Sequence, residues 1–144
     1  MREILFRGKL TDNGVWVYGD YVKAIKFDNS IAKHCIVENK SNWDLEKNTS
    51  AQEVYGVDSK TVGQFTGLYD KNGKKIFEGD KCRNTETGEI VFVVWHGTMA
   101  GYVWSRLKEG YKHLFDFGAL FRCFDKWEVI GNIHDNPELL MSDE

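Results

Sequence analysis

Acid–base chemistry in this chain would have to come from carboxylates beside turn motifs and from four histidines. General acid–base catalysis needs two titratable groups within reach of one substrate atom, with separated pKa values. Asp20 and Asp80 each follow a glycine, where an aspartate commonly caps a turn by accepting backbone N–H groups. We therefore expect these aspartates to serve the fold. The other candidates are Asp70, Asp135, Glu78, Glu128, His34, His96, His113 and His134.

Metal ligation would draw on the same histidines and on Cys35, Cys82 and Cys123. These residues lack the short CxxC, HxH or HxxxH spacings of metal sites. His34 and Cys35 are adjacent, and adjacent strand residues point to opposite faces of a sheet. The chain also lacks the nucleophile elbow, the phosphate loop and the dinucleotide fingerprint. We predict no catalytic residues, no metal and no cofactor, and an uncharacterised hydrolase is the weakest alternative.

Nucleic-acid binding is an alternative that depends on five cations within thirteen residues. They are Lys71, Lys74, Lys75, Lys81 and Arg83. If the turn and the following strand lie together, these side chains form a basic patch, and Tyr69 and Phe77 offer surfaces for base stacking. Lysines on an exposed hairpin also keep it soluble and block edge pairing, without any ligand. The acidic tail after Lys126 would repel phosphate beside such a patch.

Partner binding is the third class of function that we consider. The five tryptophans exceed what a small core needs, and tryptophan is enriched at interface hot spots. Trp43 lies within the polar segment Glu38–Gln52, which we expect to be a long loop. Trp43 is therefore the candidate partner anchor, and the alternative is that it pins this loop onto its own domain.

The elements that must position these residues are mostly strands. Thr61–Asp80 has the pattern of strand, turn and strand, and Asn72-Gly73 predicts a type I′ hairpin. The order Phe-x-Gly, Asn-Gly, Gly-Asp occurs here and also in Phe6–Asp20. The two stretches differ by one residue in spacing, so an internal duplication and two independent hairpins both remain open.

The unbroken apolar segment Ile90–Trp95 predicts a central strand covered on both faces. The preceding Asp80–Asn84 strand and Gly88 turn resemble the strand layout of SH3-like barrels. Pro137–Met141 predicts a short helical turn, since proline suits the first helical position. We predict a mostly β fold of bent antiparallel sheets, with SH3-like barrel elements and one C-terminal helical turn.

Length and charge bound the class of protein. The 144 residues suggest one domain, 1–144, which could divide into an N-terminal subdomain, 1–57, and a barrel-like part, 58–144. The net charge of −3 argues against coating nucleic acid through bulk charge. The chain has no signal-peptide pattern and no apolar run long enough to span a bilayer, so we expect a cytoplasmic protein without membrane contact.

Three stretches resemble the YopX family in order and spacing. They are Arg2–Arg7, the central Thr61–Asp80 and the closing Glu128–Leu139. The resemblance implies a small, mostly β protein encoded by bacteriophages and prophages, and it transfers no functional residues. Our hypothesis is a non-enzymatic phage accessory protein in the host cytoplasm, which binds a host or phage macromolecule or forms homo-oligomers.

Overall fold

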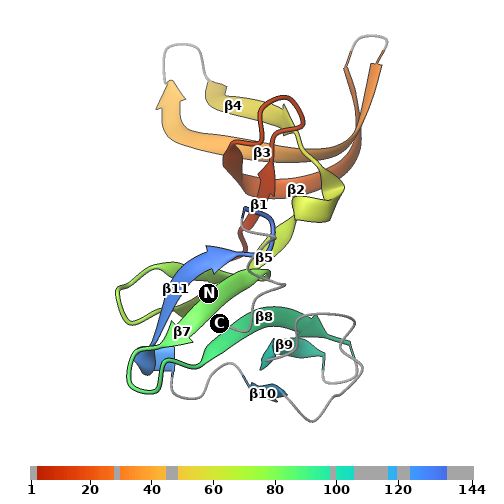
Figure 1. The fold of residues 1–144 in the computed structure, drawn as a ribbon. Helices are drawn as coiled ribbons and strands as arrows, with labels where there is room; N and C mark the ends of the chain where they lie inside the picture. The colour runs from red at the N-terminus through yellow and green to blue at the C-terminus, as the bar shows by residue number, and fades with distance from the viewer. Residues whose placement is uncertain are drawn as a thin grey trace. The chain divides into compact units, whose positions relative to one another are not determined.

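The computed structural model describes residues 3–27, 30–44, 49–97, 100–105, 117–119 and 124–135 (Figure 1). Within these ranges the regular structure consists of antiparallel strands and short 3₁₀ turns. The chain divides into two compact units, Met1–Gln64 and Phe65–Glu144. The predicted mostly β class is therefore confirmed, while Pro137–Met141 lies outside the described residues.

The first unit is one antiparallel sheet with strand order β4-β3-β2-β1-β5. A 3₁₀ turn, η1, precedes the last strand, and only the first two residues of β5 belong to this unit. The elements are β1 (Phe6–Lys9), β2 (Trp16–Phe27), β3 (Ser30–Asp44), β4 (Thr49–Gly56), η1 (Ser59–Thr61) and β5 (Gly63–Tyr69).

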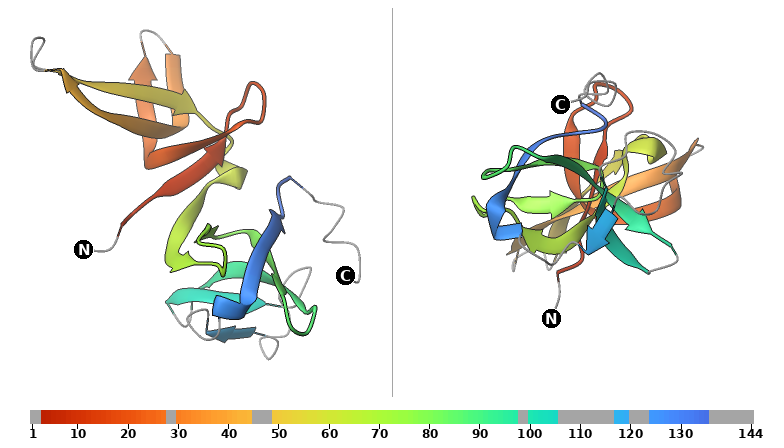
Figure 2. Two further views of the ribbon diagram at one scale, coloured as in Figure 1. Left: turned by 90° about the vertical axis from the view of Figure 1, so that its left-hand side faces the viewer. Right: turned by 60° about the horizontal axis from the view of Figure 1, so that its bottom comes forward.

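The second unit holds a five-stranded sheet with order β10-β9-β8-β7-β11, and β6 pairs with the remainder of β5 (Figure 2). Its elements are β6 (Lys75–Phe77), β7 (Asp80–Asn84), β8 (Ile90–His96), β9 (Gly101–Ser105), β10 (Phe117–Ala119), η2 (Phe124–Lys126) and β11 (Trp127–Asn132). β8 occupies the centre of the sheet, as predicted. Val91, Phe92 and Val93 are each at most 3% exposed, so successive residues on both faces of β8 are covered.

The two units share one strand plan. Among the described residues, β1 to β4 are followed by η1 and then by β5, which pairs beside β1. In the same way β7 to β10 are followed by η2 and then by β11, which pairs beside β7. The first hairpin loops also match. Leu10 N–H donates to Val15 O at 2.9 Å and Gly14 N–H to Leu10 O at 2.9 Å. The Thr85–Gly88 loop has the equivalent bonds: Asn84 N–H donates to Glu89 O at 2.8 Å, and Gly88 N–H donates to Asn84 O at 2.8 Å. The β1–β2 hairpin therefore corresponds to β7–β8.

The similarity between Phe6–Asp20 and Thr61–Asp80 in the sequence relates the β1–β2 hairpin to the β5–β6 hairpin instead. These two hairpins differ in shape. The β5–β6 loop has three residues, closed by Asp70 N–H to Lys74 O at 2.8 Å, whereas the β1–β2 loop has four. Gly73 has φ +81°, and neither Asn13 nor Asn72 has a positive φ. The type I′ prediction is therefore wrong, because only the glycine adopts the left-handed conformation, as in three-residue hairpin loops.

Gly19 and Asp20 lie inside β2 rather than in a turn. A Cβ on Gly19 would meet Val37 O at 2.2 Å, so this glycine permits close approach of β3. Asp20 pairs with Val37 in the ladder, and the predicted turn-capping role of Asp20 is wrong. Gly79, its counterpart in the sequence comparison, is in a turn with φ +92°.

The predicted loop Glu38–Gln52 is mostly a strand hairpin. β3 and β4 pair through it, from Glu38 opposite Glu53 to Asp44 opposite Thr49, with a register shift after Asn39. Residues 45–48 lie outside the described part of the chain. This segment is mostly polar and lacks the alternation of apolar and polar residues that identifies a strand in sequence. The prediction of a loop was therefore wrong.

The core of the second unit lies between β6, β7, β8 and β11. Its buried members are Ile76, Cys82, Val91, Val93 and Trp127. Partly buried side chains, Leu68, Tyr102, Trp104 and Val129, pack against them. No closed barrel is detected among the described strands, so the SH3-like barrel elements stay a prediction.

Burial predicts an unreactive thiol at Cys82. Desolvation, with a smaller contribution from the charge of Asp80, raises the pKa of Cys82 above its ordinary value. The thiolate is the reactive form, so iodoacetamide at about pH 8 should label Cys82 at least about 100-fold more slowly in the native protein than in denaturant. Peptide mass spectrometry measures the labelled fraction. Equal labelling rates in the two conditions would show that Cys82 is accessible.

Candidate functional site

The turn between β5 and β6 carries three of the five cations of the sequence-predicted patch. We call residues 69–75 the hairpin tip. Lys71 and Lys74 are exposed in the turn, and Lys75 is half-buried at the start of β6. Tyr69 ends β5 with 50% of its side chain exposed. The hairpin tip therefore combines three cations and one exposed aromatic ring within seven residues.

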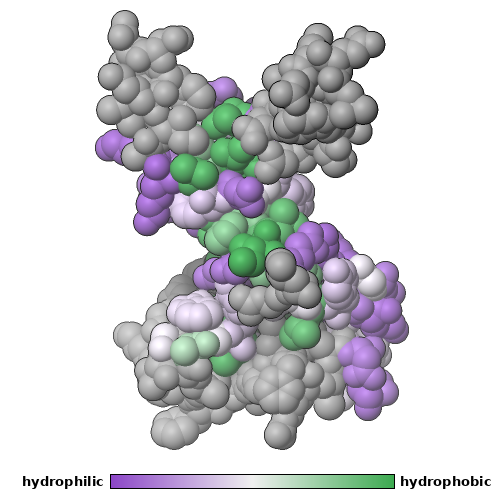
Figure 3. Space-filling model, turned by 180° about the vertical axis from the view of Figure 1, so that it is seen from behind, coloured by the Kyte–Doolittle hydropathy of each residue, from purple (hydrophilic) through white to green (hydrophobic). Residues whose placement is uncertain are grey.

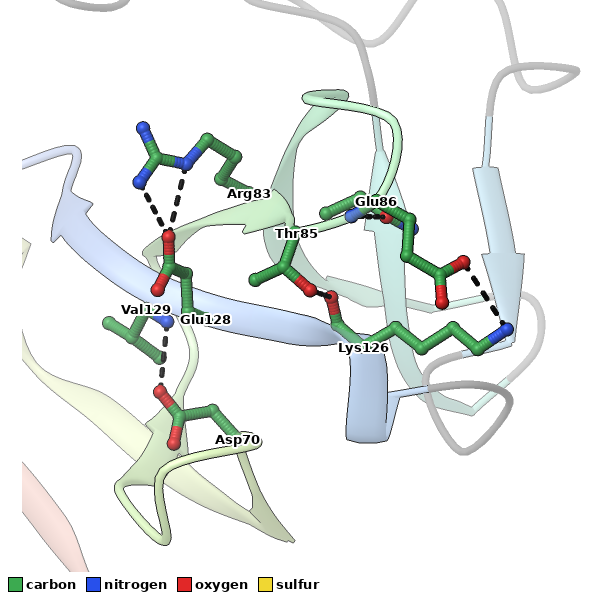
Figure 4. A network of polar contacts seen from close by, with 8 residues as sticks. Asp70, Arg83, Thr85, Glu86, Lys126, Glu128 and Val129 are labelled. Carbon is green, nitrogen blue, oxygen red and sulfur yellow. Dashed lines mark hydrogen bonds and ion pairs between the residues drawn. The ribbon is translucent and has the colours of Figure 1, made fainter.

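Asp70 holds the hairpin tip in place, and its side chain is 6% exposed. One carboxylate oxygen, Oδ1, accepts hydrogen bonds from the backbone N–H groups of Asn72 at 2.8 Å and Lys74 at 2.9 Å. The other oxygen, Oδ2, accepts the N–H of Val129 at 3.0 Å (Figure 4). Lys71 N–H also donates to Trp127 O at 3.0 Å. These bonds join the turn to β11.

Aromatic packing orients the exposed tyrosine. The ring of Tyr69 meets Phe65 edge-on, with centroids 5.5 Å apart. Lys75 pairs with Tyr69 across the two strands, and its Nζ lies 5.5 Å from the centroid of Phe65. Such cation–π contacts stabilise by about 0.5–1 kcal/mol at exposed sites. Phe65 thus positions both the ring and one cation of the hairpin tip.

The other residues of the predicted patch do not join the hairpin tip. Lys81 is 2% exposed, and its Nζ lies 5.9 Å from the centroid of Phe92. Arg83 donates from Nε at 3.1 Å and Nη2 at 2.5 Å to Oε1 of Glu128, which balances its charge. Phe77 is 4% exposed and cannot stack on a ligand. The described patch therefore has three cations rather than five.

A second set of polar contacts joins the β7–β8 loop to the segment before β11 (Figure 4). Thr85 donates from its backbone N–H at 2.9 Å and from Oγ1 at 3.0 Å to Lys126 O. The Lys126 ammonium lies 3.4 Å from Glu86 Oε2, with both side chains largely exposed. Exposed pairs of this kind contribute about 0.2–1 kcal/mol, so the backbone bonds are the firmer link.

The remaining carboxylates named from the sequence also have structural partners. Asp80 is 1% exposed, and its Oδ2 accepts the N–H of Phe77 at 2.7 Å, which confirms its predicted turn-capping role. Asp135 accepts from Asn132 Nδ2 at 2.9 Å. Within the described residues, no group of three or more His, Cys, Asp or Glu side chains could hold a metal ion.

The first unit contains a polar aromatic cluster that sequence reasoning missed. Tyr21 Oη is hydrogen-bonded to His34 Nδ1, and their rings stack with centroids 5.9 Å apart. Tyr55 donates to Glu53, and this bond raises the pKa of Tyr55 to about 12, so the phenol stays protonated at neutral pH. Ile36 lies between Tyr21 and Tyr55 in the ladder. Alternate residues of a strand share a face, so this cluster could have been predicted from the sequence if the pairing register of β2, β3 and β4 had been known.

Trp43 lies in β3, opposite Ser50 of β4. Its side chain lies outside the described part of the structure, so its role as a partner anchor stays a prediction. Of the other tryptophans, Trp127 and Trp104 pack in the core, whereas Trp95 is 52% exposed.

The described residues form an all-β protein of two units, and the two units contain sheets with the same order of strands. The chain belongs to the YopX family, whose model, described as YopX protein, matches residues 5–141. It is similar to a solved structure titled protein EF1440 from Enterococcus faecalis, with 25% identity and a TM-score of 0.54 over 97% of this chain and 99% of that chain. No curated protein matches the sequence. Among the described residues, no helix has the length and hydrophobicity to cross a membrane.

The three bonds to Asp70 predict that Asp70→Ala is strongly destabilising. Hydrogen bonds to a charged group contribute about 1.5–3 kcal/mol each and are not additive, so we expect a loss of about 3 kcal/mol in the free energy of unfolding. Urea denaturation measures it. The matched control is Asp12→Ala in the exposed β1–β2 turn, where a change within about 0.5 kcal/mol is expected. Equal effects of the two substitutions would contradict the anchoring role of Asp70.

Proposed function

We propose that this protein is a non-enzymatic binding protein whose hairpin tip contacts a macromolecule. One observation carries the proposal. Lys71, Lys74, Lys75 and the exposed ring of Tyr69 stand on a turn whose own carboxylate faces inward and accepts three backbone N–H groups. Exposed charged and aromatic side chains on a rigid turn are a common basis of recognition. A role as a phage or prophage accessory protein in the host cytoplasm is part of the proposal.

The engagement of the carboxylates supports the non-enzymatic reading. Asp70 and Asp80 accept backbone N–H groups, and Glu128 pairs with Arg83. A carboxylate bound in this way cannot rotate toward a substrate without breaking a turn or a strand contact. These side chains serve the fold, and general acid–base work would need others.

The strand plan supports the proposal that each unit is an SH3-like barrel element. β5 pairs beside β1 after η1, and β11 pairs beside β7 after η2. In the first unit Leu10 also bridges Val57 beyond β4. Fold alone assigns no function, so the binding role rests on the hairpin tip.

Site-specific cross-linking tests the binding role. A photoreactive phenylalanine derivative replaces Lys74 in one variant and Lys60, an exposed lysine of η1, in the matched control. Irradiation in cells of a bacterium that carries this sequence should give a discrete adduct at position 74 and none at position 60. Protease and nuclease digestion then identify the class of partner. Equal adduct formation at both positions, or none at either, would overturn the proposal.

Self-association is the second candidate function, favoured by apolar side chains on one face of the first unit. Tyr18, Asp20 and Val22 share one face of β2. Asp20 pairs with Val37 of β3, and Val37 pairs with Val54 of β4, so Val54 lies on the same face of the sheet. These side chains are 45%, 37% and 38% exposed. Figure 3 shows hydrophobic side chains at the surface of the described residues.

Light scattering discriminates this second candidate. Self-association through this face predicts a mass above the 16.6 kDa of one chain at about 100 μM, and Val22→Glu should return the protein to one chain. A single-chain mass for the unmodified protein at that concentration would exclude it.

A further inference from the structure

We propose that the macromolecule bound by the hairpin tip is single-stranded nucleic acid, an inference that rests on the proposed function. The tip offers cations for a phosphate backbone and an exposed ring for a base. Proteins that bind single strands without sequence preference combine these two features. The whole chain has a net charge of −3, so the recognition is local rather than a bulk effect.

The charges at the surface of the hairpin tip have one sign. Lys71, Lys74 and Lys75 are exposed or half-buried, whereas Asp70 is 6% exposed and its carboxylate accepts three N–H groups. A phosphate that approaches the turn therefore meets ammonium groups first. Lys81 is buried and Arg83 contacts Glu128, so we assign the phosphate contacts to the three lysines of the hairpin tip, including Lys75, whose ammonium also lies over the ring of Phe65.

The exposed ring favours an unpaired base over other anionic partners. Tyr69 leans edge-on against Phe65, with its side chain half exposed, so a planar ligand can stack on it. In a duplex the base faces are covered by their neighbours, so a surface tyrosine reaches an unpaired base far more readily. An acidic peptide would also satisfy the lysines, but its carboxylate side chains offer the ring no aromatic face like that of a base.

The hairpin tip is ordered before any ligand arrives. The bonds from Asp70 to Val129 N–H and from Lys71 N–H to Trp127 O fix the turn against β11. Phe65 holds Tyr69 and Lys75 beside one another. A preordered surface loses little conformational entropy on binding, so three cations and one ring can give measurable affinity.

Fluorescence anisotropy with the full chain tests the inference. The probe is a labelled oligothymidine of about 12 nucleotides, titrated between about 50 and 200 mM NaCl. Three phosphate contacts predict a slope of log K against log salt of about −2, since each contact contributes about 0.7 on single strands. Lys71→Ala and Lys74→Ala should each reduce the slope by about 0.7, and Lys60→Ala should leave it unchanged.

Tyrosine variants test the stacking arm separately. Tyr69→Ala should weaken binding about 10-fold with an unchanged salt slope, and Tyr69→Phe should retain the affinity. A duplex of the same length should bind more weakly than the single strand. Binding of the probe without salt dependence, an equal slope in the lysine variants, or preference for the duplex or for a poly-glutamate peptide would each overturn the inference. A protease-sensitive adduct at position 74 without probe binding would refute the nucleic-acid partner and leave the binding role standing.

Discussion

The carboxylate of Asp70 is the constraint on which the second unit depends. It accepts two N–H groups of its own turn and one from Val129, which lies 59 residues further along the chain. A single buried charge therefore sets the shape of the β5–β6 turn and its position against β11. Burial without these donors would cost several kcal/mol, because an unpaired carboxylate loses its hydration. Because this acid is turned inward, Lys71 and Lys74 are the exposed charges of the turn.

The sheet of the second unit explains why basic residues close in sequence have different roles. β8 lies at the centre with both faces covered, and in β7 beside it Lys81 is 2% exposed, although Lys81 and Arg83 share one face of that strand. Arg83, two residues later, reaches the surface and meets Glu128 of β11. This run of cations therefore contains one buried lysine, one arginine paired with Glu128, and the lysines of the hairpin tip.

The fold was predictable where local chemistry decides it and unpredictable where distant pairing does. The apolar run Ile90–Trp95 and the turn at Asn72-Gly73 identified a central strand and a hairpin, although the loop length and turn type differed. The hairpin of β3 and β4 was missed because its polar sequence hides the alternation. Lys71 and Lys74 were correctly placed on an exposed turn, whereas the burial of Lys81 depends on strands far away in sequence. The Tyr21–His34 contact likewise needed a register that sequence alone does not supply.

The shared strand plan has a consequence for the order in which the nascent chain can fold. β5 pairs beside β1, and β11 pairs beside β7, so neither sheet has all of its described strands until that late strand has left the ribosome. For the first unit this means synthesis through Gln64, and for the second through Asn132, where β11 ends. Such long-range pairing is slow to form, because loop-closure entropy is lost before the contacts are made. During synthesis, β7 and β8 therefore emerge well before β11, with their apolar residues and one edge still open to other chains.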